Sequence, residues 1–156
     1  MLKVIAPEVK KEWEVVVGSH EGIPVILRKE DVRVIITDVI NGASASWCAL
    51  CATRKTVPVP ESSEYEREAE NLANGGELDF YMIDPMEDDE NGKPIEKYTL
   101  TLDKFIEGIK KYLEPPYPED LVEVKGDKAN LNLTVMDGWI EDGILQTALF
   151  GDIVLD

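Results

Sequence analysis

The sequence has few cysteines, a single histidine, few basic residues and no long apolar run. Its densest apolar stretch, residues 32–40, is interrupted by Arg33, Thr37 and Asp38, and a bilayer-spanning helix needs roughly 18 or more apolar residues. The N-terminus carries one lysine before Pro7 and lacks the apolar block, about 7–15 residues long, of a secretory signal. We therefore expect no membrane span and no secretory leader, and we take the cytoplasm as the compartment.

The two cysteines, Cys48 and Cys51, are too few for a disulfide framework in a chain of 156 residues, which agrees with a reducing compartment. Trp47 precedes them in a Trp-Cys-x-x-Cys motif that is typical of thioredoxin-like redox sites. In that fold a core strand precedes the motif and a long helix follows it, and neither pattern is present here. If the stretch is a β-strand, positions three apart face opposite sides and the two sulfurs diverge. We interpret both cysteines as buried and inert, with a redox role as the alternative.

Ligands for a metal or cofactor are also scarce. Two cysteines and His20 leave even a three-ligand zinc site dependent on a carboxylate, and His20 lies in a predicted exposed turn. The acidic segment 84–92 does not fit an EF-hand, because Tyr98 occupies the position of the bidentate glutamate. The sequence contains no P-loop, dinucleotide-binding, nucleophile-elbow or zinc-protease motif. We predict no cofactor and no metal, and we lean against an enzyme.

Acidic residues outnumber basic ones by 32 to 16, which gives a formal net charge of −16. Residues 1–60 hold 8 basic and 7 acidic groups, residues 61–120 hold 6 and 18, and residues 121–156 hold 2 and 7. Binding to a nucleic-acid backbone needs clustered Lys and Arg, so we exclude direct nucleic-acid binding and disfavour an anionic membrane surface. Two explanations remain: simple solubility, or attraction to a basic protein partner.

Apolar periodicity predicts interleaved helices and strands. The clearest strands, at about 77–84 and 95–101, flank an Asn91-Gly92 turn and predict an antiparallel β-hairpin. We therefore predict one α+β domain over residues 1–156, with an antiparallel sheet packed by four or five amphipathic helices. The apolar positions indicate helices over 9–17, 32–43, 65–73, 102–113 and 140–149, and extended segments over 25–27, 46–59 and 131–135.

Capping residues predict where several helices begin and end. Ser63 and Glu66 have the spacing of a capping box, and Thr101 and Asp137 are suited to cap the next two helices. Gly151 is expected to end the last helix, because glycine readily adopts the left-handed conformation of a C-terminal cap.

The surplus of negative charge leads to our main functional hypothesis, a non-enzymatic accessory or inhibitor protein that binds a basic protein surface. In its sharpest form, carboxylates presented like phosphates mimic nucleic acid. The candidate contact residues are Glu87, Asp88, Asp89 and Glu90. The alternatives are a small enzyme or redox protein that uses Cys48 and Cys51, and a homo-oligomeric assembly module with Trp13 and Trp139 as contacts.

Four local strings are distinctive when taken together: Trp47-Cys48, Asn74-Gly-Gly-Glu-Leu78, Tyr98-Thr-Leu-Thr-Leu-Asp-Lys-Phe-Ile106 and Ile144-Leu-Gln-Thr-Ala-Leu-Phe-Gly-Asp-Ile-Val154. They resemble a family of small acidic uncharacterised proteins that bacterial phages and integrated mobile elements encode. The similarity covers roughly residues 30–156. Because that family has no assigned activity, the resemblance implies no catalytic residues. It implies an accessory protein that acts on the machinery of a host or of a rival element.

Overall fold

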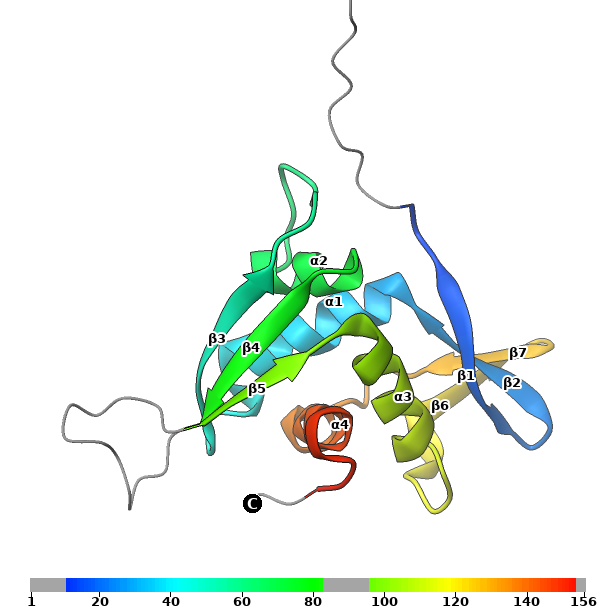
Figure 1. The fold of residues 1–156 in the computed structure, drawn as a ribbon. Helices are drawn as coiled ribbons and strands as arrows, with labels where there is room; N and C mark the ends of the chain where they lie inside the picture. Colours follow the sequence, from blue (N-terminus) through cyan, green and yellow to red (C-terminus); the bar gives the residue numbers. More distant parts are fainter. Residues whose placement is uncertain (1–10, 83–95, 154–156) are drawn as a thin grey trace, which may run out of the picture.

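The strands form two sheets, and the computed structural model describes residues 11–82 and 96–153 (Figure 1). The four-stranded sheet has the order β1-β2-β7-β6 and the three-stranded sheet the order β3-β4-β5. The four-stranded sheet is mixed, because β2 and β7 run parallel, whereas all other pairs are antiparallel. The strands are β1 (Glu14–His20), β2 (Ile23–Arg28), β3 (Cys48–Lys55), β4 (Glu77–Met82), β5 (Glu96–Leu100), β6 (Val122–Lys125) and β7 (Lys128–Leu131).

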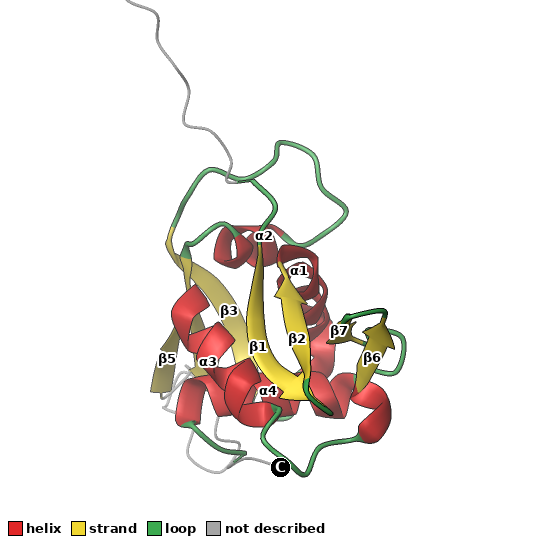
Figure 2. Ribbon diagram, turned by 90° about the vertical axis from the view of Figure 1, so that its right-hand side faces the viewer, coloured by secondary structure: helices red, strands yellow, loops and turns green. Residues whose placement is uncertain are grey.

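The helices lie between the two sheets, which Figures 1 and 2 show from two perpendicular directions. α3 packs against α4 and β1, and α4 also contacts α1, η1 and β5. None of the helices in the described ranges is long and apolar enough to cross a bilayer. The helices are α1 (Lys29–Asp38), the π-helical turn η1 (Val39–Ala43), α2 (Arg67–Ala73), α3 (Leu102–Tyr112), the short 3-10 helix η2 (Glu119–Leu121) and α4 (Gly138–Phe150).

One cluster of buried apolar side chains connects both sheets with the four α-helices. The α+β class predicted from the sequence is confirmed, and so is the antiparallel pairing of residues 78–82 with 96–100. The turn predicted at Asn91-Gly92 lies outside the described residues. The single antiparallel sheet is wrong in part, because the strands divide between two sheets and one pair is parallel.

The helix predicted over residues 9–17 is wrong, because Glu14–His20 form β1. Three consecutive valines at 15–17 favour an extended backbone, since β-branched side chains pack well on a pleated surface. Val17 is buried and Val16 is 56% exposed, which is the alternation of a strand with one covered face. Glu21 and Gly22 both have positive φ angles, so they form the type of two-residue turn that joins β1 to β2.

The predicted start of α2 is also wrong. Glu66, not Ser63, is the N-terminal flanking residue of this helix, and the Ser63 hydroxyl accepts a hydrogen bond from the Tyr65 backbone N–H in the preceding loop. The predicted end is confirmed: Gly76 N–H donates to the Asn71 carbonyl and Gly75 N–H to the Leu72 carbonyl, at 2.8 and 3.0 Å. These are the two hydrogen bonds of a Schellman motif, which satisfies carbonyls left open at the helix end.

The remaining differences concern residues 122–135. The strand predicted over 131–135 ends at Leu131, and Leu133 and Val135 follow in irregular structure. Its neighbour β6 was not predicted: Val122 and Val124 alternate with Glu123 and Lys125, but four residues are too few for this alternation to identify a strand. The caps at Thr101 and Asp137 are confirmed, because their side chains accept hydrogen bonds from the backbone N–H groups three residues later.

The packing of α3 on α4 depends on a glycine at the crossing point. A Cβ added to Gly108 would lie 2.6 Å from the Cα of Ala148, which is closer than side chains approach a backbone. Gly108→Ala therefore forces the two helices apart. We expect a loss of about 1–3 kcal/mol in the free energy of unfolding, measured by urea denaturation.

Gly138→Ala at the start of α4 is the matched control. There an added Cβ would meet Ala43 at an ordinary 3.8 Å, and we expect no loss because alanine restricts the unfolded chain more than glycine does. Equal stability of the Gly108→Ala variant and the natural protein would contradict the packing argument.

Candidate functional site

The structure places only some of the site residues expected from the sequence. Glu87, Asp88, Asp89 and Glu90 lie outside the described residues, so their role in binding stays a prediction. Cys48 and Cys51 lie in β3, and no disulfide joins them.

The two cysteines share a face of the three-stranded sheet, contrary to expectation. The register pairs Cys48 with Met82 and Cys51 with Phe80, and positions two apart on β4 fall on one face. A bulge between Cys48 and Leu50 inserts one residue and reverses the alternation. Both cysteines are partly buried and pack against the core.

Burial raises the pKa of the Cys51 thiol well above its usual range, and the neighbouring Cys48 raises this pKa further. The thiolate is the reactive form of cysteine, and redox sites lower the thiol pKa by placing it at a helix N-terminus or beside a cation. The environment of Cys51 has the opposite effect, which favours the interpretation of an inert thiol.

His20 lies 2.7 Å from Tyr117, measured from Nδ1 to the phenolic oxygen, and this hydrogen bond joins the β1–β2 hairpin to the segment after α3. The contact gives His20 a structural partner. Within residues 11–82 and 96–153, no three or more His, Cys, Asp or Glu side chains are grouped so that they could hold a metal ion.

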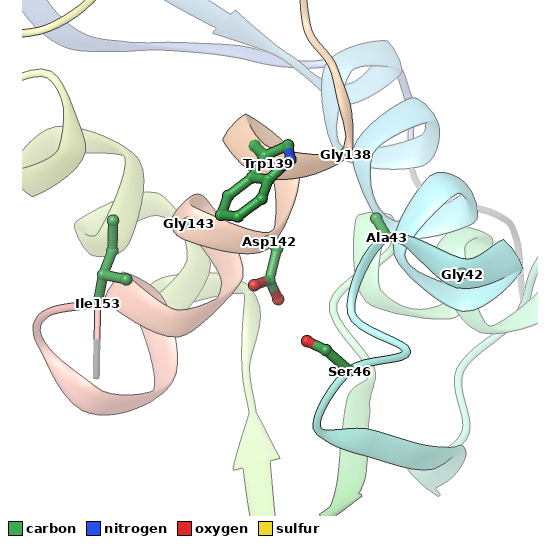
Figure 3. A pocket seen from close by; sticks show the side chains of 8 residues that line it. All are labelled: Gly42, Ala43, Ser46, Gly138, Trp139, Asp142, Gly143 and Ile153. Carbon is green, nitrogen blue, oxygen red and sulfur yellow. The ribbon is translucent and has the colours of Figure 1, made fainter. Parts of the chain in front are cut away.

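The best candidate site is a pocket of about 400 Å³ between η1 and α4, shown in Figure 3. Small-molecule sites in proteins commonly occupy ~300–1,000 Å³, so the hollow is large enough for a side chain or a small ligand. It is lined by Gly42, Ala43, Ser46, Gly138, Trp139, Asp142, Gly143 and Ile153.

Three glycines create the space. Gly42 has a φ of 131°, a conformation that residues with a side chain rarely adopt, and an added Cβ there would meet open space. Gly138 and Gly143 lie on α4 across the hollow, where any side chain would fill part of it. Gly42 and Ala43, at the end of the helix predicted over 32–43, thus also form part of one wall of the pocket.

Asp142 is the polar group of the pocket and is held in a fixed orientation. Its Oδ1 accepts hydrogen bonds from the Ser44 hydroxyl at 2.6 Å and from the Trp47 indole N–H at 2.7 Å. Its Oδ2 accepts one from the Gln146 amide at 2.8 Å. A carboxylate has about four acceptor positions, so these three bonds leave capacity for one more donor. Figure 3 shows the carboxylate extending from α4 toward Ser46.

Trp139 stands at the rim and is 84% exposed, the highest value among the large apolar residues that the structure describes as exposed. Ile153, which is 53% exposed, lines the same pocket. Exposed apolar groups that gather at one place indicate a binding surface more strongly than scattered ones. Trp13, the other tryptophan expected at an interface, is half-buried and donates its indole N–H to the Ala73 carbonyl at 3.0 Å.

The two segments that build the pocket carry only negative formal charges. Residues 34–53 and 129–153 contain no lysine and no arginine. Their acidic residues are Asp38, Asp137, Asp142 and Asp152, together with Glu141, which is held in its neutral form as described below. The Asp137 side chain caps α4 by accepting a hydrogen bond from the Ile140 N–H at 3.0 Å, so a negative charge already occupies this helix terminus. Lys111 of α3 lies close to Gly151 at the far end of α4. The four aspartates outnumber this lysine, so the field at the pocket favours a cationic ligand.

Glu141 is buried beside this site and is held in its acid form. Burial and a hydrogen bond with Asp38 raise the pKa of Glu141 to about 9, and Asp137 adds to the effect. Its Oε2 has no hydrogen-bond partner. At neutral pH the protonated carboxyl donates to Asp38, which ties α4 to the end of α1.

The raised pKa of Glu141 predicts a pH-dependent stability. The group stabilises the fold fully below its ordinary pKa of 4.5, and this contribution falls as the pH rises toward about 9. Glu141→Gln keeps a donor for Asp38 and removes the titration. We expect the variant to match the natural protein near pH 4.5 and to exceed its free energy of unfolding by about 1–3 kcal/mol at pH 7.

Urea denaturation across this pH range measures the difference between the two proteins. Glu107→Gln on the exposed face of α3 is the control and should show no such divergence. Parallel pH profiles for Glu141→Gln and the natural protein would show that Glu141 is ionised in the fold.

Comparisons of the chain with protein-family models, with curated proteins and with solved structures find no match. The resemblance to proteins of phages and mobile elements therefore stays a prediction. The residues of the pocket and the charge around it are therefore the basis for a functional proposal.

Proposed function

We propose that this chain is a non-enzymatic acidic accessory protein that binds a basic surface of another protein. One observation carries the proposal: an exposed tryptophan stands beside a fixed carboxylate on a face whose segments contain acidic residues and no basic ones. Tryptophan is among the residues that contribute most to binding energy at protein interfaces. The surrounding carboxylates supply charge complementarity to a basic partner.

The basic residues near the N-terminus support the proposal because most of those described are held in internal contacts. Arg33 pairs with Glu70 and also forms two hydrogen bonds with Glu12, at 2.6 and 2.9 Å. Lys29 is 1% exposed and donates to the Asn74 side chain at 2.7 Å. These cations do not form an outward basic patch, although residues 1–60 are slightly positive overall.

The distribution of acids favours a protein-binding patch over a continuous imitation of a phosphate backbone. On α3, Asp103 and Glu107 alternate with Lys104, Lys110 and Lys111. Mixed charges on this helix do not resemble a row of phosphates. Nucleic-acid mimicry through other acidic segments stays a prediction.

An assembly module is the second candidate, because Trp139 and Ile153 together expose apolar surface. In a symmetric dimer through this patch, each copy would bring the same carboxylates to the interface. Like charges facing one another cost binding energy, so we place this candidate second.

The proposal predicts a salt-dependent association. Immobilised protein, exposed to a cell lysate at low salt, should retain a basic protein. After that protein is purified, its association rate with the chain should fall at least about tenfold between about 50 and about 300 mM salt, because salt screens steering by surface charge. Stopped-flow or surface plasmon resonance measures the rate.

A charge-neutral substitution, Val16→Ala on the exposed face of β1, provides the control for handling and immobilisation. Retention of acidic or neutral proteins alone, or an association rate that does not change with salt, would contradict the proposed function.

A further inference from the structure

Trp139 at the rim of the pocket and the carboxylate of Asp142 lie on one face of α4. Trp139 and Asp142 are three residues apart on this helix, a spacing that places their side chains as neighbours. Figure 3 shows both beside the hollow that Ser46 faces from the opposite wall. A ligand in the pocket would therefore touch an aromatic ring and a carboxylate at once.

Charge decides which ligands can use this pair. An anion in the pocket would be repelled by the carboxylate of Asp142. The N-terminus of α4 could attract an anion, but Asp137 already caps it. A neutral apolar group could cover Trp139 and Ile153 but would leave the remaining acceptor position of Asp142 without a donor. A cation with a flat apolar surface satisfies both features.

Among protein side chains, arginine combines these properties. Its planar guanidinium stacks on aromatic rings and donates in a fork, whereas the lysine ammonium is a compact and strongly hydrated charge. One branch of the fork can donate to Asp142, and Ser46 offers a hydroxyl oxygen on the opposite wall. The aliphatic stem of arginine suits the apolar wall formed by Ala43 and Ile153.

We propose that the pocket between η1 and α4 receives an arginine side chain of the basic partner, stacked on Trp139 and paired with Asp142. The inference rests on the proposed function and adds the chemical group that the surface recognises.

A peptide series tests the subsite without knowledge of the partner. The probes are acetylated and amidated Gly-Arg-Gly, the same peptide with lysine, and the same peptide with citrulline, which has nearly the shape of arginine but no charge. Nuclear magnetic resonance follows the indole N–H signal of Trp139, assigned with Trp139→Phe. We expect saturable shifts with arginine, weaker binding with lysine and none with citrulline.

Substitutions at Ser46 change the charge of the rim without touching Trp139 or Asp142. Ser46 is exposed, and we expect Ser46→Lys to weaken arginine binding about tenfold and Ser46→Glu to strengthen it. Ser19→Lys on β1 carries the same charge change at an exposed position of the four-stranded sheet and should leave binding almost unchanged. Trp139→Ala should weaken binding about two- to fivefold, the effect of an exposed cation–π contact. In this variant the indole N–H of Trp47, which donates to Asp142, replaces Trp139 as the signal that is followed.

Each outcome supports or overturns the inference. Binding of citrulline as tight as that of arginine, equal effects of the two lysine substitutions, or preference for an acidic peptide would overturn it. Shifts of the Trp139 signal that grow with protein concentration in the absence of any peptide would assign the patch to a second copy of the chain.

The proposed function and the subsite can fail separately. If the basic protein binds with the expected salt dependence but is insensitive to Ser46→Lys and Trp139→Ala, only the arginine subsite is wrong. If no basic protein binds while the arginine peptide does, the subsite stands and the proposed function is wrong.

Discussion

The hydrogen bonds of Asp142 are the constraint on which the arrangement of the pocket depends. Through Ser44 and Trp47 this carboxylate joins α4 to the loop after η1, which is about 100 residues away in the sequence. Trp47 is itself buried, and its ring meets Phe150 edge-on at 5.8 Å between centroids. Phe150 in turn meets Tyr98 of β5 at 4.7 Å. One side chain on α4 thus fixes the walls of the hollow and is anchored to the three-stranded sheet.

The protein handles its buried carboxyl groups in two ways. Asp31 and Glu70 are paired with Arg28 and Arg33, so their negative charges are compensated inside the molecule. Glu141 has no basic partner and is held protonated instead. Both solutions avoid the large cost of an unpaired buried charge. The uncompensated negative charge is consequently left on the surface, where the proposed function requires it.

Local signals in the sequence are sufficient for much of the fold. The helices at α1, α3 and α4 are predictable because their apolar spacing persists over three turns, and Thr101 and Asp137 occupy cap positions that the structure confirms. The β4–β5 pairing follows from two alternating segments around a turn signal. The division into two sheets depends on non-local contacts: the parallel pairing of β2 with β7 joins residues about 100 positions apart, and no local pattern specifies it.

The N-terminal strand shows how one segment can satisfy two patterns. Val9, Trp13 and Val16 have helical spacing, but the three valines at 15–17 and the turn at Glu21-Gly22 favour a hairpin with β2. The turn is hard to recognise, because glutamate at a positive φ is unusual. Pairing of Glu14–His20 with β2 gives the backbone groups that face β2 their hydrogen-bond partners, which outweighs the helical periodicity of a few apolar residues.

The sequence indicates single residues of the pocket but not the pocket itself. Trp139 was predicted only as a contact of a homo-oligomer; its side chain is exposed, and the contact itself stays a prediction. The sequence analysis missed Asp142, because nothing near this residue in the sequence indicates that Ser44 and Trp47 donate to it. One sequence feature could have indicated the pocket: residues 34–53 and 129–153 contain no lysine and no arginine. Only the packing of η1 on α4 shows that these two segments form a single surface.

The combination of an exposed tryptophan with uncompensated carboxylates also bears on selectivity. An apolar patch alone would attract many proteins, including other copies of this chain. The surrounding negative charge opposes self-association and the approach of other acidic proteins, while it accelerates encounters with basic ones. In the proposed complex, surface charge would determine which proteins approach, and Trp139 would add affinity once a basic partner is in contact.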